Sequence, residues 1–433
     1  MQTKNLQEIL NKLEISQLNA MQQEAYQSIG ENSNTVLLSP TGSGKTLAFL
    51  LPLLENLDPD LAEVQALILV PSRELAIQIE QVTREMGAGF KANAVYGGRA
   101  FSKDKIELQH APAILIGTPG RVADHFRRET FSTKNIKALV LDEFDKSLEV
   151  GFENEMKEII GELSGLDKRI LTSATQNIDI PGFVGLKNPK RIDYLKGEQP
   201  SLKIKTIQVN PKTKLQSLVN LLSENAEGSG IIFCNLKDSI AEVSDFLDKN
   251  NIEHGIFSGG MEQKDRERSL IKFRNGTHRI LIATDLAARG IDVPEIDFII
   301  HYQLPFKASE FTHRNGRTAR MHQEGIAYVL SDRRTLPDFI KSNDYKIQNK
   351  KNNTDEVEKT TLFISGGRKD KISKGDIAGL FLKQGNLKKE ELGLIELKQD
   401  CAFVAVPNEK AEELISTLNN SRLKKKKVRV RYI

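Results

Sequence analysis

A short glycine-rich segment gives the strongest chemical signal in the sequence. It reads Ser39-Pro-Thr-Gly-Ser-Gly-Lys-Thr46 and lies between the β-type run Thr35–Leu38 and a helical pattern. Glycines let the backbone curl so that several N–H groups face one anion, and the next helix adds its dipole. A flexible Gly/Ser turn is the alternative, but the strand–loop–helix context favours phosphate binding. We therefore predict a nucleotide-phosphate and Mg²⁺ site made by Thr41, Gly42, Ser43, Gly44, Lys45 and Thr46.

A later strand-like run ends in acids of the kind that NTP hydrolysis needs. The segment Asp142-Glu143-Phe144-Asp145 follows the run Ala138–Leu141. Carboxylates at strand ends lie at the ligand-binding edge of an α/β sheet. We expect Asp142 to bind Mg²⁺ and Glu143 to act as the general base that polarises the attacking water. Judged in isolation these acids would more often be a solvated helix start, but the upstream phosphate loop favours NTP hydrolysis.

Both segments need a framework of parallel strands to bring them together. Short apolar runs alternate with helical patterns, first up to residue 172 and again from residue 230 to residue 330. Such runs indicate parallel sheets with helices on both faces. We predict an α/β chain with two tandem sheet domains at residues 1–200 and 206–345, followed by a polar linker at 346–359. The β- and α-type runs of residues 360–433 predict a small ferredoxin-like α+β domain.

Composition narrows the classes of function. With 28% charged and 39% hydrophobic residues, the chain is typical of soluble globular proteins. The only cysteines, Cys234 and Cys401, exclude a disulfide framework or a cysteine-rich zinc module. No apolar run approaches the ~20 residues that span a bilayer, so a cytoplasmic protein without a membrane partner is expected. The net charge is +4, yet residues 360–433 hold 16 Lys/Arg and 9 Asp/Glu, which favours a nucleic-acid partner for that end.

Across about Leu6–Leu330 the motifs, in their order, resemble those of DEAD-box RNA helicases. In addition to the two segments above, the chain contains Pro71-Ser-Arg-Glu-Leu75, Gly97-Gly98, Thr118-Pro-Gly-Arg121, Ser173-Ala-Thr175, Ile232-Phe-Cys-Asn235, Gln263-Lys-Asp-Arg266, Thr284-Asp-Leu-Ala-Ala-Arg-Gly-Ile-Asp292 and His313-Arg-Asn-Gly-Arg-Thr-Ala-Arg320. Any one motif is weak, whereas the full ordered set is specific. The resemblance implies two RecA-like domains, ATP and Mg²⁺ as cofactors, and an RNA-stimulated ATPase that opens RNA duplexes.

The resemblance also assigns residues around ATP. Gln22 lies 23 residues before Lys45, the spacing of the family's Q motif, and an amide can pair with adenine N6 and N7. Asp292 resembles the residue that contacts the ribose. Arg317 and Arg320 resemble the family's arginine fingers, whose delocalised charge suits a transferred phosphoryl group. Ser173 and Thr175 are implied to couple the nucleotide site to strand separation.

RNA contacts in the family come from loops of both domains. These loops offer mainly backbone amides, hydroxyls and arginines, which suit recognition of phosphate and 2′-OH and carry little base code. The positions implied in this chain are Arg73, Gly98, Thr118, Arg121, Arg266 and Thr284.

Five positions depart from the family pattern. Phe144 replaces a small alanine, Ala319 replaces a glycine, and Gln303 stands where an aspartate is usual. Asn5 and Ile15 occupy places where the family usually has aromatic residues that help to hold adenine. We expect an active enzyme whose coupling and nucleotide affinity are altered.

The C-terminal stretch resembles the RNA-recognition-type domain of the DbpA subgroup of bacterial DEAD-box proteins. The resemblance rests on Gly366-Gly-Arg-Lys369 and Lys374-Gly-Asp376, and it implies RNA contacts by Arg368 and Lys369. In that subgroup the domain anchors the helicase to a hairpin of large-subunit ribosomal RNA. Phe363 and Phe403 lie on the two strands where an ordinary RNA-recognition domain stacks bases, but either ring could equally be core.

The sequence as a whole therefore predicts an ATP-dependent RNA helicase that locally unwinds duplexes. Its expected partner is 23S-type ribosomal RNA and large-subunit precursors during ribosome assembly, and a cytoplasmic monomer is expected. One alternative is an ATP-gated RNA clamp or scaffold without catalysis, which Phe144 and Ala319 favour. A DNA helicase of the same superfamily is the other.

Overall fold

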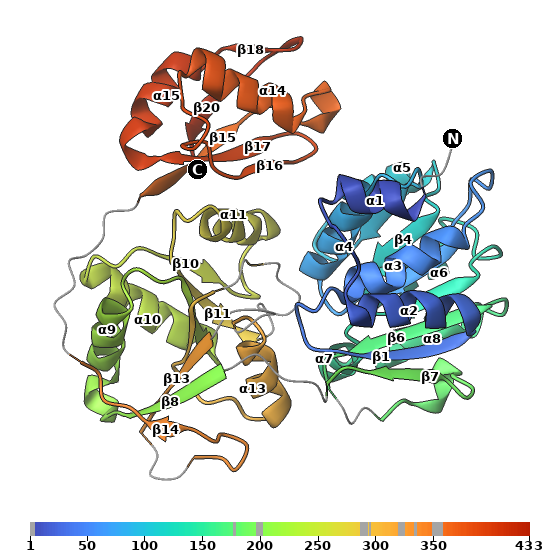
Figure 1. The fold of residues 1–433 in the computed structure, drawn as a ribbon, viewed down its shortest axis with the longest axis horizontal. Coiled ribbons are helices and arrows are strands. Elements are labelled where there is room, and N and C mark those ends of the chain that lie inside the picture. Colours follow the sequence, from blue (N-terminus) through green and yellow to red (C-terminus); the bar gives the residue numbers. More distant parts are fainter. Residues whose placement is uncertain are drawn as a thin grey trace. The chain divides into compact units, whose positions relative to one another are not determined.

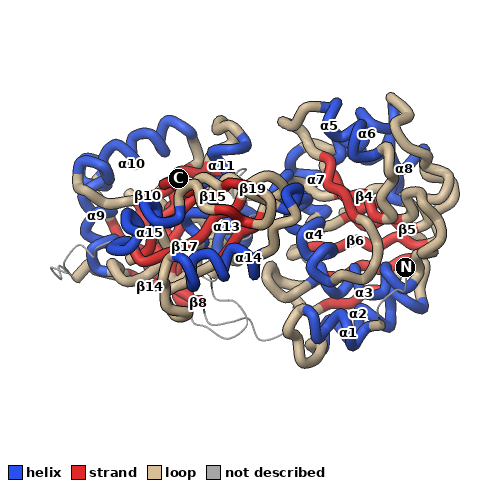
Figure 2. The backbone as a smooth tube through the Cα atoms, turned by 90° about the horizontal axis from the view of Figure 1, so that it is seen from above, coloured by secondary structure: helices blue, strands red, loops and turns tan. Residues whose placement is uncertain are grey.

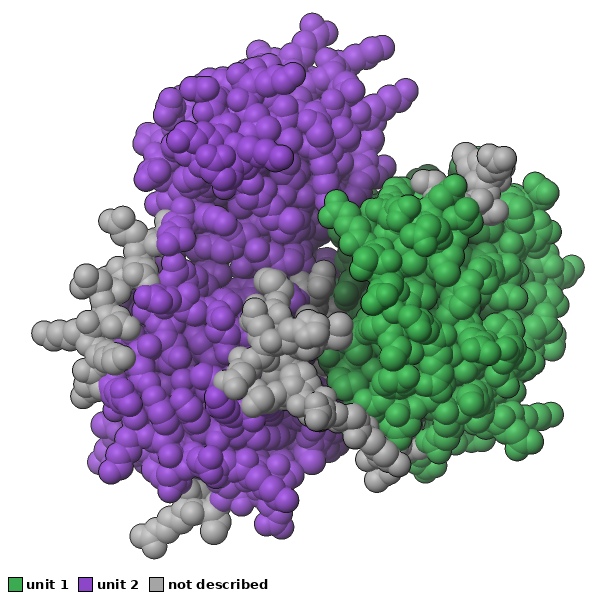
Figure 3. All heavy atoms as spheres, viewed as in Figure 1, with its two compact units in different colours: residues 1–200, 289–292, 320–323 green, residues 201–288, 293–319, 324–433 purple. Residues whose placement is uncertain are grey.

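The computed structural model describes residues 5–175, 179–195, 202–285, 293, 296–318, 325–332, 336–348 and 358–433. The chain divides into two compact units (Figure 3). Unit 1 comprises residues 1–200 with 289–292 and 320–323, and unit 2 comprises residues 201–288, 293–319 and 324–433. Asp292, Ala319 and Arg320 lie outside the described residues.

Unit 1 contains a seven-stranded sheet in the order β3-β4-β2-β5-β6-β1-β7, and every pairing in it is parallel (Figure 1). The strands are β1 (Asn34–Leu38), β2 (Ala66–Leu69), β3 (Ala92–Val95), β4 (Ile114–Gly117), β5 (Ala138–Leu141), β6 (Lys168–Ser173) and β7 (Lys190–Asp193). The helices are α1 (Leu6–Lys12), α2 (Ala20–Glu31), α3 (Lys45–Glu55), α4 (Arg73–Met86), α5 (Phe101–Leu108), α6 (Pro119–Arg127), α7 (Phe144–Val150) and α8 (Glu153–Glu162).

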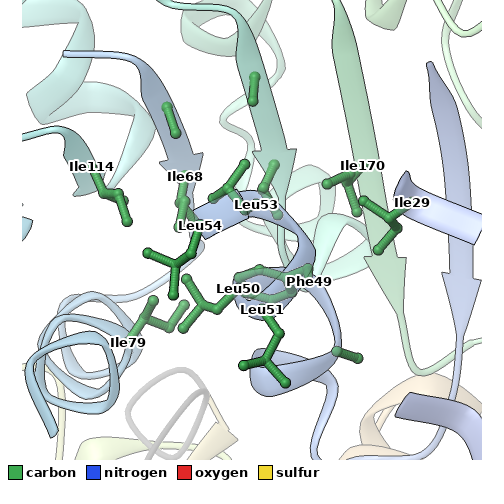
Figure 4. Close-up of a cluster of buried hydrophobic side chains, with 14 of the residues drawn as sticks. Ile29, Phe49, Leu50, Leu51, Leu53, Leu54, Ile68, Ile79, Ile114 and Ile170 are labelled. Atoms are coloured by element: carbon green, nitrogen blue, oxygen red, sulfur yellow. The ribbon is translucent and has the colours of Figure 1, made fainter. Parts of the chain in front are cut away.

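Both faces of this sheet are apolar, which is why its strands read as nearly continuous hydrophobic runs. Successive residues of a strand point to opposite faces, so Ile68 belongs to one core cluster while Leu67 and Leu69 belong to the other. The first cluster packs α3, through residues such as Phe49 and Leu53, against the sheet (Figure 4).

The chemically important loops share one edge of the sheet because the strands are parallel. Helices α3, α4, α6 and α7 begin shortly after the C-terminal ends of β1, β2, β4 and β5, respectively. Ser72 caps α4 with its side chain, and α6 begins at Pro119, whose fixed φ suits a first helical turn. The edge therefore carries the phosphate loop, the acidic segment and two of the predicted RNA loops.

Unit 2 contains a second parallel sheet, in the order β10-β11-β9-β12-β13-β8-β14. Figure 2 shows strands flanked by helices in this unit as in unit 1. The described elements are β8 (Leu202–Gln208), α9 (Lys214–Glu224), β9 (Gly230–Cys234), α10 (Lys237–Lys249), β10 (His254–Phe257), α11 (Gln263–Arg274), β11 (Ile280–Thr284), β12 (Phe298–His301), α13 (Ala308–Asn315), β13 (Gly325–Ser331) and β14 (Asn343–Asp344).

The same unit ends in a small domain with a four-stranded antiparallel sheet in the order β16-β17-β15-β20. Its elements are β15 (Lys359–Ile364), α14 (Lys374–Gly379), β16 (Ile395–Leu397), β17 (Ala402–Pro407), α15 (Ala411–Leu418), β18 (Arg422–Leu423), β19 (Lys426–Lys427) and β20 (Val430–Tyr432). The order β-α-β-β-α-β is that of the ferredoxin-like fold. The predicted fold class is thus confirmed.

Several strands were not predicted from the sequence. β3 reads Ala-Asn-Ala-Val and β16 reads Ile-Glu-Leu, so neither has the long apolar run by which strands are recognised. No helix in the described part of the chain is long and apolar enough to cross a membrane.

Candidate functional site

The predicted phosphate loop has the geometry of an anion cradle. Gly42 and Gly44 have φ values of +83° and +86°, which L side chains rarely adopt. A Cβ atom on Gly44 would also lie 2.4 Å from the Nε2 atom of Gln22. The loop enters α3, whose first-turn N–H groups have no partner within the helix, so it can accept a phosphate.

Lys45 is folded into this loop. Its Nζ atom donates hydrogen bonds to the carbonyl oxygens of Ser39 and Pro40, both at 2.7 Å. Burial lowers the pKa of Lys45 to about 8, and the carboxylates of Asp142 and Glu143 partly oppose that shift. The nearby carboxylates thus offset only part of the cost of burying the Lys45 ammonium, and the negative charge of a bound polyphosphate would stabilise it further.

Asp142 and Glu143 lie at the end of β5, as the sequence predicts. Asp142 is buried, with 3% of its surface exposed, and the Thr172 hydroxyl on β6 donates to its Oδ1 atom. The backbone N–H of Glu143 lies 3.1 Å from the same Oδ1 and 3.2 Å from the Thr172 hydroxyl. Burial, followed by the charge of Glu143, raises the pKa of Asp142 to about 6. Burial therefore disfavours the ionised form of this carboxylate, and a bound cation would favour that form.

Glu143 has a partner that the sequence did not indicate. The Nζ atom of Lys146 lies 2.8 Å from its Oε2 atom, and Lys146 is fully buried. Glu143 itself has a left-handed backbone, with φ at 49°, which turns the chain sharply between β5 and α7. The predicted general base is thus fixed by an internal ion pair and a strained backbone position.

Phe144 does not enter the nucleotide site. Its side chain is fully buried and belongs to the second core cluster, together with Leu141 and Met156. The large ring therefore replaces a small residue within the core, beneath the acidic segment.

A hydrogen bond joins the predicted coupling motif to the acidic segment. The Thr175 hydroxyl donates to the Oδ2 atom of Asp145 at 3.1 Å. The Ser173 hydroxyl, in turn, accepts from the Thr175 backbone N–H at 2.9 Å. A movement of the Asp145 side chain can thus be transmitted through these hydrogen bonds to the loop that follows β6.

Gln22 lies against the phosphate loop. Its Oε1 atom accepts from the backbone N–H of Asn19, and its Nε2 atom donates to the carbonyl oxygen of Gly44 at 3.2 Å. An amide has two donor hydrogens and two acceptor lone pairs, so one of each remains for adenine. Asn5 caps α1 through its side chain, and Ile15 packs on the first core cluster.

The donor chemistry around Asp142 fits Mg²⁺. This ion prefers oxygen ligands and usually binds one or two carboxylates together with water and phosphate. Within the described residues, hydrogen bonds to Asp142 engage Oδ1 alone, which leaves Oδ2 for a cation or its water. The Thr46 hydroxyl, in the first turn of α3, is the second predicted ligand.

The predicted RNA residues of unit 1 follow β2, β3 and β4. Arg73 and Gly98 are brought together, since a Cβ atom on Gly98, where φ is +84°, would lie 2.5 Å from an Arg73 Nη1 atom. Thr118 immediately precedes α6 and is 7% exposed. Arg121 points into the protein, where its Nε atom donates to the buried carboxylate of Asp104 at 2.7 Å. The RNA contact of Arg121 stays a prediction, because the described partners of its side chain are protein groups.

In unit 2, Arg266 on α11 lies over the ring of Phe257 at 4.7 Å, and Thr284 ends β11. Arg317 follows α13 and is 4% exposed. The ribose contact predicted for Asp292 and the finger predicted for Arg320 fall outside the described residues.

Arg314 is a site residue whose function the sequence reasoning did not identify. It is 1% exposed, and its guanidinium donates to Asp285 at 2.6 and 2.5 Å, to Asn235 Oδ1 at 2.7 Å and to the Gln303 carbonyl at 2.7 Å. These acceptors follow β11, β9 and β12, which are neighbours in the sheet. The Gln303 amide oxygen also accepts from the Asn235 N–H at 2.7 Å. One arginine therefore ties three motif loops together, and the topology of the sheet was the signal that could have revealed it.

In the C-terminal domain, Arg368 and Lys369 lie in a short 3-10 turn after β15. Two nearby lysines pair internally, Lys424 with Asp376 at 3.1 Å and Lys426 with Asp370 at 2.7 Å. These pairs hold the basic β18–β19 hairpin beside the turn that carries Arg368.

Three protein families match successive parts of the chain. Residues 19–181 match the DEAD/DEAH box helicase family, residues 213–322 the helicase conserved C-terminal domain, and residues 361–432 the DbpA RNA binding domain.

Two similar proteins are the ATP-dependent RNA helicases DbpA of Bacillus subtilis (strain 168) and of Escherichia coli (strain K12). The Bacillus subtilis protein is 32% identical to this chain, and the match covers 95% of this chain and 93% of that protein. The Escherichia coli protein is also 32% identical, and the match covers 98% of this chain and 96% of that protein. A similar solved structure is that of S. cerevisiae Dbp5 bound to RNA and ADP BeF3, with 28% identity, a TM-score of 0.68, and 76% of this chain and 88% of that chain covered. The chain therefore belongs to the DEAD-box family of ATP-dependent RNA helicases, in the group that carries a DbpA RNA-binding domain.

Proposed function

We propose that this helicase opens short duplexes in 23S-type ribosomal RNA and large-subunit precursors during ribosome assembly in the cytoplasm, as a monomer. The observation that carries the proposal is the match of residues 361–432 to the DbpA RNA binding domain. The two helicase domains, which form the motor, are expected to contact the RNA backbone and to distinguish poorly between bases. A motor of this kind needs a separate module to choose its substrate. Tethering such a module raises the local concentration of nearby duplex, to ~mM for short flexible linkers.

The proposed chemistry follows from the geometry of unit 1. Backbone N–H groups of residues 41–46 and the Lys45 ammonium bind the β- and γ-phosphates, while Gln22 selects adenine. Glu143 accepts a proton from the water that attacks the γ-phosphate. Thr46 and Asp142 would hold Mg²⁺, which would supply positive charge to stabilise the phosphate oxygens. Arg317 and Arg320 supply further positive charge to the transferred group.

Catalysis is favoured over a passive ATP-gated clamp. The departures that favour the clamp are Ala319, which lies outside the described residues, and the large ring of Phe144. The ring lies in the core, and both Asp142 and Glu143 remain at the ligand edge of the sheet. RNA, rather than DNA, is the proposed stimulator, and equal-length RNA and DNA strands in an ATPase assay distinguish the two.

Target choice is tested by RNA competition on the full chain. We expect a large-subunit ribosomal RNA fragment to compete at least tenfold better than a shuffled RNA of the same length. Replacing Arg368 and Lys369 together by Glu should remove that preference and leave ATPase stimulation by the shuffled RNA intact. A matched control is the double replacement of the exposed Lys388 and Lys389 by Glu in the same domain. Equal competition by both RNAs would refute the target and leave the helicase assignment standing.

A further inference from the structure

A buried acid in unit 1 contacts two of the loops that are predicted to bind RNA. Loop 97–100 follows β3 and loop 118–121 follows β4, and these strands are neighbours in the sheet. Asp104 lies on α5, the helix that joins the two strands, and its side chain is fully buried. Its carboxylate reaches a side chain from each loop.

Three contacts tie the loops together through this carboxylate. The Nε atom of Arg121 donates to Asp104 Oδ2 at 2.7 Å, and the Nε atom of Arg99 lies 3.2 Å from Oδ1. An Nη2 atom of Arg121 also donates to the backbone carbonyl oxygen of Arg99 at 2.6 Å. The guanidinium of Arg121 therefore joins the first turn of α6 both to α5 and to the backbone of loop 97–100.

The cluster is closed on its inner side. The Nε2 atom of His125, which is also fully buried, lies 3.3 Å from Asp104 Oδ2, and the Phe101 ring stacks on this imidazole with centroids 4.5 Å apart. Burial alone would raise the pKa of Asp104, but hydrogen bonds from His125 and Arg121 and the charge of Arg99 hold it below its usual range. The carboxylate is thus ionised, and a buried charge of this kind is costly to leave without its partners.

Loop 97–100 needs such an external tie. Gly97 and Gly98 have no side chains, and Gly98 has a φ of +84°, so the free loop has more backbone freedom to lose than most segments. Backbone N–H groups that recognise phosphate or 2′-OH must be held at a fixed spacing. A loop that is ordered before RNA arrives does not charge that ordering to the binding step.

We propose that Asp104 is a positioning residue for RNA binding, which holds loops 97–100 and 118–121 as one preformed surface. Arg121 then acts as a strut between the loops, and the RNA is contacted by the backbone around Gly98 and by Thr118. This inference rests on the predicted RNA contacts of those two loops and not on the choice of RNA target. It has an unusual consequence, because removal of an acid should weaken binding of a polyanion, whereas charge alone predicts the opposite.

The test is the RNA dependence of ATP hydrolysis by the full chain, with the shuffled RNA as the probe. Asp104→Asn keeps the size of the side chain but removes its charge and turns one acceptor oxygen into a donor that faces arginine. The RNA concentration for half-maximal stimulation should rise about tenfold, while kcat at saturating RNA and KM for ATP stay within about twofold. A merely structural residue would lower kcat with the fraction of folded protein and leave the half-saturating RNA concentration unchanged.

Asp124→Asn is the matched control. It removes the same charge from α6, where Asp124 pairs with Arg128 at 2.8 Å outside the cluster, and it should not raise the half-saturating RNA concentration. An unchanged value in Asp104→Asn would overturn the proposal, as would a loss confined to kcat. A lower value would also overturn it, because it would show that Asp104 withholds Arg121 from the RNA.

Amide hydrogen exchange of the RNA-free chain gives a second readout, on Arg121→Lys. Lysine keeps the positive charge, but a single ammonium cannot reproduce the fork that reaches both Asp104 and the Arg99 carbonyl. Amides of loop 97–100 should exchange about tenfold faster, while β1 and β5 keep their protection. Unchanged exchange in the loop would show that Arg121 is not a strut, and faster exchange throughout unit 1 would show that the cluster only stabilises the fold. Either result overturns the proposal, and this measurement carries the test alone if Asp104→Asn does not fold.

Discussion

Replacing Asp142 by Asn should stabilise the nucleotide-free protein while removing its ATPase activity. Burial and the neighbouring Glu143 raise the pKa of Asp142 to about 6, from 3.8 in an exposed carboxylate. The folded protein therefore binds this proton more tightly than the unfolded chain does. At 1.36 kcal/mol per pKa unit, the shift corresponds to about 3 kcal/mol that the ionised carboxylate costs the folded state.

The sign of the pH dependence follows from the same shift. Between about pH 3.8 and pH 6 the folded state holds more protons than the unfolded state, so the free energy of unfolding falls as the pH rises through this window. Above the window the whole cost is present. An asparagine carries no charge at any pH, and its amide oxygen can still accept the hydrogen bond from Thr172. The variant should therefore be about 3 kcal/mol more stable at pH 7.5 and lack this slope.

The assay is thermal unfolding of the full chain at several pH values from 5 to 8. The transition to follow is the one that ADP shifts in the unmodified protein, since the domains need not unfold together. For a unit of this size, 3 kcal/mol corresponds to about 6–12 °C at that transition. Asp60→Asn, the same change at an exposed position of unit 1, should have no effect. An Asp142→Asn variant that is no more stable than the unmodified chain, or that keeps the same slope, would refute this reasoning.

Three further variants test other parts of the site. Gly44→Ala should weaken ATP binding by about tenfold or more, as measured by titration calorimetry. The reason is that φ at this position is +86° and the new Cβ atom would lie 2.4 Å from the Nε2 atom of Gln22. An unchanged affinity for ATP would contradict this reasoning. Thr175→Val removes the hydrogen bond to Asp145. The rate of duplex unwinding should therefore fall severalfold, while the rate of RNA-stimulated ATP hydrolysis stays within about twofold of the unmodified protein. An equal loss of both rates would rule out a coupling function. Arg314→Lys leaves buried acceptors on Gln303 and Asn235 without their donors. The free energy of unfolding, measured by urea titration, should therefore fall by about 2 kcal/mol. A fall of less than about 0.5 kcal/mol would contradict the structural role of Arg314.

The sequence was sufficient where local patterns determine structure. The glycines at 42 and 44 with Lys45 after an apolar run predicted a strand, a loop and a helix, and the parallel arrangement then required the acids at 142 and 143 to lie at the same edge. Partners supplied by tertiary packing could not be predicted in this way. Lys146 is one turn beyond Glu143, and only the burial of α7 determines that the two pair rather than face water. The packing of Phe144 was open for the same reason.

The C-terminal domain shows a similar division. Alternation in β15 separates Leu362 and Ile364 from Thr361 and Phe363, so the sequence can indicate that the strand has two faces. It cannot indicate what covers the second face, because Arg274 and Glu396, which form an ion pair there, are 122 residues apart and each reads as an ordinary surface charge. The sequence therefore could not distinguish a base-stacking Phe403 from a buried one, and the structure shows that the side chain is buried.

Steady-state ATPase of the full chain, with and without RNA, is the most direct test of the central claim that Glu143 activates water for RNA-stimulated ATP hydrolysis. The unmodified protein should be stimulated by RNA. Glu143→Gln keeps the size and shape of the side chain but exchanges one acceptor oxygen for an NH2 donor and cannot take up a proton, so kcat should fall by about 100-fold or more. The same variant should still bind RNA in an ATP-dependent way. RNA-stimulated turnover that is undiminished in Glu143→Gln would contradict the account.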